Sequence, residues 1–127
     1  MSDDVSRLGR FYCEVLGFNT VVEEGHYVEF KNDGVRFAIC AKSLMADNTN
    51  DHYSFIEERK GQAFEFNFQC ESPEAVRLIY GDFVSKGAIS ITEPMSMSWE
   101  HTTGSFADPD GNIHSLFAVN PITVEEE

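Results

Sequence analysis

The sequence Asp-Pro-Asp-Gly-Asn at residues 108–112 constrains the fold most, because an apolar run, 113–119, follows it directly. Pro109 fixes the φ angle of the second turn residue, and Gly111 supplies a positive φ. Aspartate side chains in such a turn accept hydrogen bonds from nearby backbone N–H groups. We therefore predict that residues 113–119 form a strand near the end of the fold, paired as a hairpin with the strand before the turn.

Two helices are predicted, and a glycine ends each of them. Apolar residues recur at the helical interval over residues 8–16, and Gly17 follows as a left-handed stop. The second helix begins with Ser72 as the capping residue and Pro73 in the first helical position. It ends at Gly87, which lies 70 residues after Gly17.

The other periodic stretches have strand character, with β-branched and aromatic residues or strict alternation. In residues 64–70, three Phe alternate with Glu65, Asn67 and Gln69, so we expect one packed face and one polar face. An Asp-Gly turn at Gly34 separates two of the runs, which predicts a further hairpin. The predicted strands are residues 18–22, 26–30, 35–40, 64–70, 88–92, 98–107 and 113–119.

The order of these elements predicts an internal duplication. The turn glycines Gly34 and Gly111 lie 77 residues apart, which implies a seven-residue insertion in the second copy. The first half lacks the strand that precedes the helix in the second half, and the resulting open sheet edge favours pairing with a partner chain. We expect one α+β domain with module one (αβββ) at 1–42, an irregular linker at 43–61, module two (βαβββ) at 62–121 and an acidic tail at 122–127.

The composition argues against several classes of partner. The 127 residues include 9 Lys and Arg against 22 Asp and Glu, a formal charge of −13 that repels nucleic-acid phosphates and anionic membranes and favours cationic ligands. Cys13, Cys40 and Cys70 form no CxxC pair and are interpreted as buried, reduced thiols. The first residues lack a signal-peptide pattern, and no apolar run approaches the ~18 residues of a membrane span. We expect a cytoplasmic protein.

Two motifs carry a resemblance to a known family. Residues 10–18, Arg-Phe-Tyr-Cys-Glu-Val-Leu-Gly-Phe, are similar to a helix end written "FY..vLGF", and residues 106–112 resemble an "f.DPDGN" turn before a last strand. Both motifs are typical of the glyoxalase, bleomycin-resistance and extradiol-dioxygenase superfamily, also called vicinal oxygen chelate proteins. The resemblance implies two βαβββ modules whose curved sheets form a cavity, usually in a homodimer.

The resemblance also indicates where a metal ion would bind. Metalloenzymes of the superfamily hold a divalent ion with His or Glu residues from the first and last strands of each module. The matching positions here are Glu65, Ser115 and Ala38, and the fourth lies off the chain. Only Glu65 could act as a ligand, whereas such sites need at least two or three anionic or imidazole groups. We therefore expect no cofactor, although ligands from an upstream strand or a shifted register leave a divalent metal open.

A ligand-binding role follows from the same positions. The polar face of residues 64–70 would line the cavity, with Glu65 as counter-ion to a cationic ligand, although a solvated sheet face is the commoner meaning of such alternation. Trp99, the single tryptophan, offers stacking and cation–π attraction of ~0.5–2 kcal/mol, or else packs in the core. The predicted ligand-binding set is Glu65, Asn67, Gln69, Trp99, Ser115, Phe117 and Ala38.

The leading functional prediction is a metal-independent protein that binds or sequesters a small antibiotic-like or toxin-like molecule, cationic or aromatic in character. No catalytic residue is assigned. One alternative is a metal-dependent glyoxalase-like lyase, isomerase or dioxygenase. Another is a non-catalytic dimerisation or regulatory subunit that binds no small molecule. Fold-level likeness does not choose among these functions.

Overall fold

A computed structural model of the chain describes residues 1–58 and 60–122. The acidic tail expected at residues 122–127 lies, apart from Ile122, outside the described residues. Within the described ranges, no helix is both long enough and apolar enough to cross a membrane.

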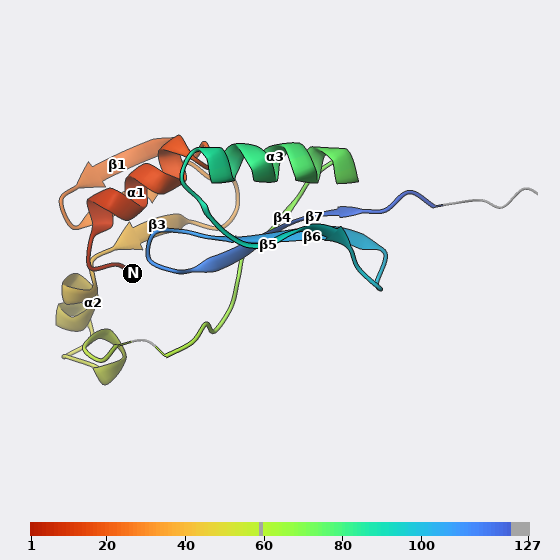
Figure 1. The fold of residues 1–127 in the computed structure, drawn as a ribbon. Coiled ribbons are helices and arrows are strands. Elements are labelled where there is room, and N and C mark those ends of the chain that lie inside the picture. Colours follow the sequence, from red (N-terminus) through yellow and green to blue (C-terminus); the bar gives the residue numbers. More distant parts are fainter. Residues whose placement is uncertain (59, 123–127) are drawn as a thin grey trace, which may run out of the picture. The chain divides into compact units, whose positions relative to one another are not determined.

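The chain divides into two compact units, each with its own sheet (Figure 1). The described residues form three α-helices and two sheets, which confirms the predicted α+β class. Unit 1 comprises Met1–Ala63 and Asp108–Gly111, and unit 2 comprises Phe64–Ala107 and Asn112–Glu127.

Unit 1 begins with a helix, α1, followed by a three-stranded antiparallel sheet. The strands follow one another in the order β1-β2-β3, which confirms the hairpin predicted at Gly34. Gly34 has the positive φ, 91°, that its turn requires. The bounds are α1 (Val5–Glu14), β1 (Thr20–Glu24), β2 (Tyr27–Phe30) and β3 (Phe37–Cys40).

Helix α1 begins earlier than the apolar periodicity predicts, because Asp4 caps it. The Asp4 side chain accepts a hydrogen bond from the backbone N–H of Arg7, which satisfies one of the free donors of the first turn. The helix ends at Glu14, and Gly17 follows with a φ of 82°, as the glycine stop predicts.

The core of unit 1 is largely aromatic. The rings of Tyr12, Phe18, Phe30 and Phe37 contact one another with centroids 5.4 to 6.2 Å apart. These residues come from α1, the segment after it, β2 and β3, so one cluster joins the helix to the sheet. Aromatic pairs of this kind contribute about 0.5–1.5 kcal/mol each beyond the area that they bury.

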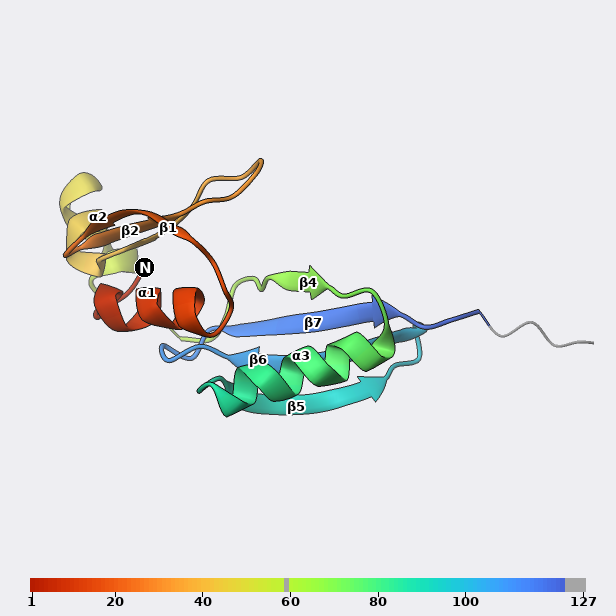
Figure 2. The ribbon, with the colours of Figure 1, turned by 90° about the horizontal axis from the view of Figure 1, so that it is seen from above.

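Unit 2 contains a four-stranded sheet with one helix, α3, along one face (Figures 1 and 2). The strand order is β4-β7-β6-β5, with β4 parallel to β7 and the other pairs antiparallel. Ser72 caps α3 through the backbone N–H of Ala75, as predicted. The bounds are β4 (Asn67–Gln69), α3 (Pro73–Ser85), β5 (Ile89–Ser96), β6 (His101–Ala107) and β7 (Ile113–Val119).

The face of this sheet that carries α3 forms the core of unit 2. Phe106 is fully buried, and its ring meets Phe83 of α3 edge-on at 5.3 Å. Gly104 allows close approach, because a Cβ atom there would lie 3.1 Å from Cδ2 of Tyr80 and 2.9 Å from Cγ of Pro94. Leu116 of β7 pairs with Gly104 and is also buried. Even-numbered residues of β6 and β7 therefore face α3.

The missing first strand of unit 1 is represented by a single position. Ser2 forms an isolated parallel bridge with Ala41, through hydrogen bonds from Ser2 N–H to the Cys40 carbonyl, 2.9 Å, and from Lys42 N–H to the Ser2 carbonyl, 3.0 Å. In unit 2, β4 lies parallel to β7 in the same way. Among the described residues, Ser2 alone pairs with that side of β3.

The stretch 43–61 was expected to be irregular, and this is wrong. It contains most of α2 (Lys42–Asn48) and the short 3₁₀ helix η1 (Tyr53–Phe55). The polar residues 47–51 lie at the end of α2 and just beyond it, where Asn50 and Asp51 adopt positive φ angles that Asn and Asp tolerate.

The predicted strand at 64–70 is also shorter than expected, since β4 spans only Asn67–Gln69. The backbone N–H of Phe66 donates to Nδ1 of His114 at 3.1 Å instead of joining the strand ladder. Phe64 does not pack as expected and is 77% exposed. The Phe66 carbonyl still accepts from Ser115 N–H at 3.0 Å, so the His114 side chain takes only the N–H of Phe66 at the edge of β4.

The 108–111 turn is anchored inside unit 1 by its two aspartates. Asp108 is fully buried and accepts a hydrogen bond of 2.8 Å from the Tyr12 hydroxyl. Asp110 accepts hydrogen bonds from Ser2 Oγ, 2.6 Å, and from an Arg7 guanidinium nitrogen, 3.0 Å. The turn motif and the helix motif of the sequence thus contact each other directly.

Replacing Tyr12 by Phe should destabilise the protein by about 1.5–3 kcal/mol, because it removes a hydrogen bond to a buried carboxylate. Urea unfolding followed by circular dichroism measures this change. Tyr53→Phe is the matched control, since Tyr53 is largely exposed and the change should stay within about 0.5 kcal/mol. Equal midpoints for the two variants would contradict the anchoring role.

The same hydrogen bond should make stability depend on alkaline pH. Burial, together with the negative charge and hydrogen bond of Asp108, raises the pKa of Tyr12 above its ordinary value. The contribution of the neutral phenol is therefore complete below pH ~10 and declines as pH rises, by up to about 1.4 kcal/mol per pH unit. The free energy of unfolding should fall more steeply above about pH 10 for the natural sequence than for Tyr12→Phe, and parallel curves would contradict this prediction.

Candidate functional site

The face of the unit 2 sheet opposite α3 carries most of the residues that the sequence singled out. We call it the open face. Directly paired residues of neighbouring strands share a face, so the register forms two rows of side chains across the sheet. The polar row is Asn67, Ser115, Ser105 and Thr92; the mixed row is Gln69, Phe117, Thr103 and Met95.

Glu65 is joined to the polar row by Ser115. Both carboxylate oxygens of Glu65 lie 3.3 Å from Ser115 Oγ, and Ser115 Oγ lies 3.1 Å from Ser105 Oγ. Ser115 is only 3% exposed, whereas Glu65 is exposed. The Ser115 hydroxyl, which is hydrogen-bonded to Ser105, therefore orients the Glu65 carboxylate while that carboxylate stays accessible to solvent.

The position of Glu65 depends on a histidine from the other face of the sheet. His114 is 5% exposed, and its ring stacks on Phe66 with centroids 5.0 Å apart. Because its Nδ1 accepts the Phe66 N–H, this nitrogen carries no proton in the described geometry. His114 thus packs on the α3 side of the sheet, next to Ser115 in the sequence, and its ring holds the backbone beside Glu65.

The mixed row leads to an aromatic end of the open face. Phe117 is half-buried and stacks on His101 with ring centroids 5.2 Å apart and an interplanar angle of 22°. His101, Thr103 and Ser105 were not in the predicted set, although alternation along 101–107 would have placed them together. Their face follows from pairing with β7, which the sequence did not determine.

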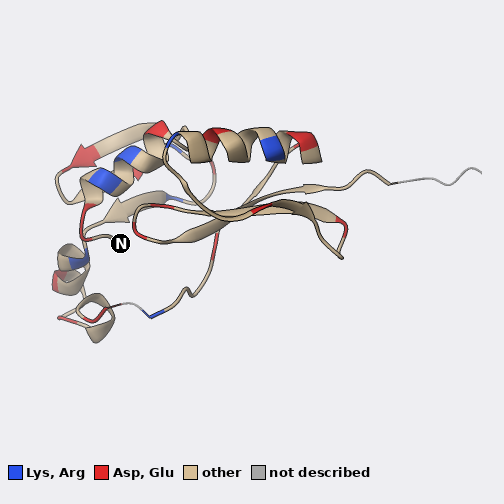
Figure 3. Ribbon diagram, viewed as in Figure 1, with Lys and Arg blue, Asp and Glu red and all other residues tan. Residues whose placement is uncertain are grey.

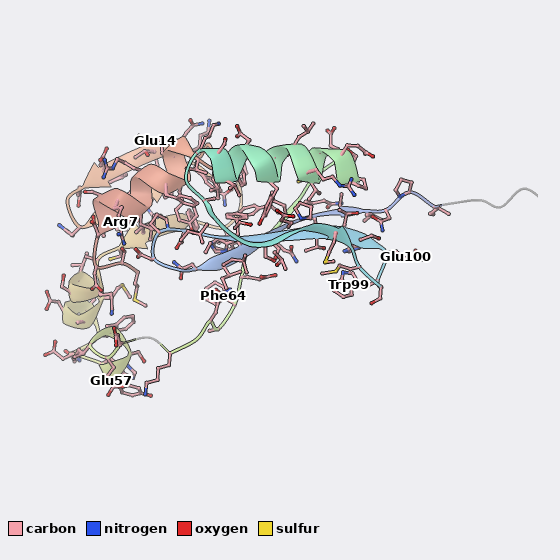
Figure 4. All side chains as sticks on the ribbon, in the orientation of Figure 1. Arg7, Glu14, Glu57, Phe64, Trp99 and Glu100 are labelled. Atoms are coloured by element: carbon pink, nitrogen blue, oxygen red, sulfur yellow. The ribbon has the colours of Figure 1, made fainter. Side chains whose placement is uncertain are left out.

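The structure does not bring Trp99 next to Glu65. Trp99 lies in the loop at the tip of the β5–β6 hairpin, on the side of the sheet away from α3 (Figure 4). His101, at the start of β6, pairs with Val119, which lies four residues beyond Ser115, a strand distance of about 13 Å. Trp99 is 59% exposed, so it is not a core tryptophan. Glu65 and Trp99 therefore mark opposite ends of the open face.

Ala38 stands apart from the other predicted site residues because it belongs to unit 1. It lies on β3, half-buried, and pairs with Glu29 of β2. Neighbouring Tyr27 donates a hydrogen bond of 2.6 Å to Glu29, which lowers the pKa of that carboxyl. The remaining six predicted residues all belong to unit 2.

The donor set at Glu65 does not fit a divalent metal ion. Its nearest polar partner is a serine hydroxyl, and no group of three or more His, Cys, Asp or Glu in the described part of the chain could hold a metal. A hard cation such as Mg²⁺ or Ca²⁺ needs several oxygen anions, and Zn²⁺ needs three or four nitrogen, sulfur or oxygen ligands. The described donors around Glu65 therefore fall short of a divalent-metal site.

The three cysteines differ in exposure. Cys13 is exposed, contrary to the expectation of burial, while Cys40 and Cys70 are half-buried, and none forms a disulfide. Burial raises the pKa of the Cys70 thiol, which favours its unreactive protonated form. The open face presents a carboxylate, hydroxyl groups and aromatic rings.

Comparison with known proteins gives the family. The family model of the Glyoxalase/Bleomycin resistance protein/Dioxygenase superfamily matches residues 1–115, so the chain belongs to this superfamily. This confirms the resemblance that the helix and turn motifs indicated. No curated protein matches the sequence significantly.

Solved structures share the fold at low sequence identity. A glyoxalase/bleomycin resistance protein/dioxygenase from Nocardioides has a TM-score of 0.83 at 20% identity, over 99% of this chain and 83% of its own. A family enzyme from Burkholderia phytofirmans PsJN has a TM-score of 0.81 at 19% identity, over 93% and 92%. A lactoylglutathione lyase from Agrobacterium tumefaciens has a TM-score of 0.68 at 17% identity, over 92% and 86%. At these identities the likeness shows the fold alone.

Proposed function

We propose that this chain is a metal-independent binding protein that acts in the cytoplasm, as a homodimer, and sequesters a small organic cation with a planar aromatic part. The observation that carries the proposal is the accessible Glu65 carboxylate on the open face, which accepts from the Ser115 hydroxyl, itself hydrogen-bonded to Ser105. Three cysteines without a disulfide support a reducing compartment.

Charge supports the cationic part of this ligand. The chain carries a formal charge of −13, and acidic segments occur in both units (Figure 3). Such a field raises the local concentration of cations and their rate of association. Glu65 provides the local negative charge for a bound cation. Both of its carboxylate oxygens lie near the Ser115 hydroxyl, and the side chain is otherwise exposed to solvent.

The aromatic end supports the planar part. The stacked rings of His101 and Phe117 lie two residues along β7 from Ser115, a distance of about 7 Å, and Trp99 lies further along the same direction. A ligand with a cationic group near Glu65 and a ring near Phe117 would match this spacing. Stacking and cation–π contacts contribute about 0.5–2 kcal/mol each.

Binding of proflavine, a planar cationic acridine, tests this proposal through quenching of Trp99 emission. Glu65→Gln should weaken binding three- to fivefold at low salt, since an exposed ion pair contributes up to about 1 kcal/mol. The difference should shrink as salt is added. An anionic naphthalene sulfonate of similar size should bind the variant at least as well as the natural sequence.

Glu71→Gln is the matched control, because Glu71 is an exposed glutamate of unit 2 outside the two rows. Equal loss of proflavine affinity in Glu65→Gln and Glu71→Gln would reduce the effect to net charge and contradict the site. Absence of any proflavine binding would favour the non-catalytic dimerisation or regulatory subunit.

Metal independence has its own measurement. Protein incubated with nickel, manganese, iron or zinc salts and then desalted should retain far less than one ion per chain, because the described donors near Glu65 include a single carboxylate. Elemental analysis gives the metal content. About one tightly held ion per chain, lost in Glu65→Gln, would favour the metal-dependent lyase or dioxygenase instead.

A further inference from the structure

The loop that carries Trp99 has a fixed backbone geometry. Met97 N–H donates to the His101 carbonyl at 2.7 Å, and Glu100 N–H donates to the Met97 carbonyl at 3.1 Å. Glu100 has a φ of 62°, in the left-handed region that residues other than Gly, Asn and Asp rarely adopt. A turn followed by a left-handed residue is a known three-residue hairpin connection, and glycine usually occupies the left-handed position.

Asn120, the residue that follows β7, makes three hydrogen bonds to this loop and to the strand ends beside it. Its Oδ1 accepts a hydrogen bond of 2.6 Å from Thr102 Oγ1, and its Nδ2 donates to Ser96 Oγ at 2.8 Å. Its backbone N–H donates to the Glu100 carbonyl at 2.8 Å. Asn120 therefore joins the end of β5, the loop and the start of β6, and Thr102 is almost fully buried.

Asn120 acts from the side of the sheet opposite the open face. Thr102 pairs with Ala118 and has the same parity as Gly104, which faces α3. Ser96 pairs with Thr102, so both hydroxyl groups lie on the α3 side of the hairpin. The Asn120 side chain, which is hydrogen-bonded to both, lies on that side as well. Trp99 extends away from α3 (Figure 4). Asn120 thus contacts the loop from the α3 side, and its side chain would not touch a ligand bound on the open face.

These hydrogen bonds restrict the conformation of the loop backbone, while the Trp99 indole that the loop carries stays exposed. Aromatic anchors contribute most to binding when they are held in the bound geometry beforehand, because less conformational entropy is lost on association. Trp99 is 59% exposed and makes no ring contact among those described, so the conformation of the loop backbone has a large part in setting its direction.

We propose that Asn120 is a positioning residue, which holds the Trp99 loop so that the indole stands in one orientation at the aromatic end of the open face. The consequence is selectivity for planar ligands long enough to reach from Glu65 to that end. The proposal rests on the proposed function for its ligand, but the loop geometry itself is tested without one.

Fluorescence anisotropy decay of Trp99 is the first test, because this is the sole tryptophan and reports on the loop alone. Asn120→Ala should add a large nanosecond component of local motion that the natural sequence lacks. Ser96→Ala removes one of the bonds at an exposed position and should give a smaller increase, while Asn19→Ala, an exposed asparagine of unit 1, should give none. Unchanged motion in Asn120→Ala and Ser96→Ala, with circular dichroism showing folded protein, would overturn the proposal.

Proflavine affinity is the second test, with Trp99→Ala as the reference, its binding followed by dye absorbance. Asn120→Ala should lose about as much affinity as Trp99→Ala, roughly fivefold, and the double variant should lose little more. Increased Trp99 motion without any loss of affinity would overturn the positioning role. If the natural sequence binds no planar cation, the proposed function fails, and the anisotropy decay alone decides whether Asn120 holds Trp99.

Discussion

The hydrogen bond between Tyr12 and Asp108 is the interaction on which unit 1 most depends, because it places a carboxylate in an apolar environment with a defined partner. The Tyr12 ring also belongs to the aromatic cluster of Phe18, Phe30 and Phe37, so one side chain serves the core with its ring and the turn with its hydroxyl. A buried carboxylate that loses a donor costs far more than an exposed one. In this chain the helix motif supplies Tyr12 and the turn motif supplies Asp108, so each motif contributes half of one buried contact.

Local chemistry was enough to predict much of the fold. Strand β7, the helix cap at Ser72 and the glycine stops after both main helices follow from residues within a few positions of each other, and all are observed. The errors have different origins. At the edge of β4, the N–H of Phe66 goes to His114, which lies 48 residues away in the sequence. Helix α2 was missed for a local reason, since the polar residues at its end are also typical of loops.

Part of the candidate site was also predictable from the sequence, and part was not. Alternation placed Glu65, Asn67 and Gln69 on one side, and the register puts Ser115 and Phe117 beside the latter two. The same alternation could not tell that His101, Thr103 and Ser105 share that side, because the facing of β6 is set by its pairing with β7. Nor could it give the separation of Trp99 from Glu65, which depends on how far the β5–β6 hairpin extends. Periodicity yields the sides of a strand, whereas the distances across a site come from the loops and register that connect the strands.

The length of that hairpin distinguishes the two copies of the duplicated unit. Strands β5 and β6 have 8 and 7 residues, whereas their counterparts β1 and β2 have 5 and 4. Each arm is thus three residues longer, which accounts for most of the seven-residue offset between the copies and extends the arm by about 10 Å. The added residues lie in the hairpin that carries Trp99 at its tip. The length of this arm therefore sets how far Trp99 stands from Ser115 and Glu65 along the open face.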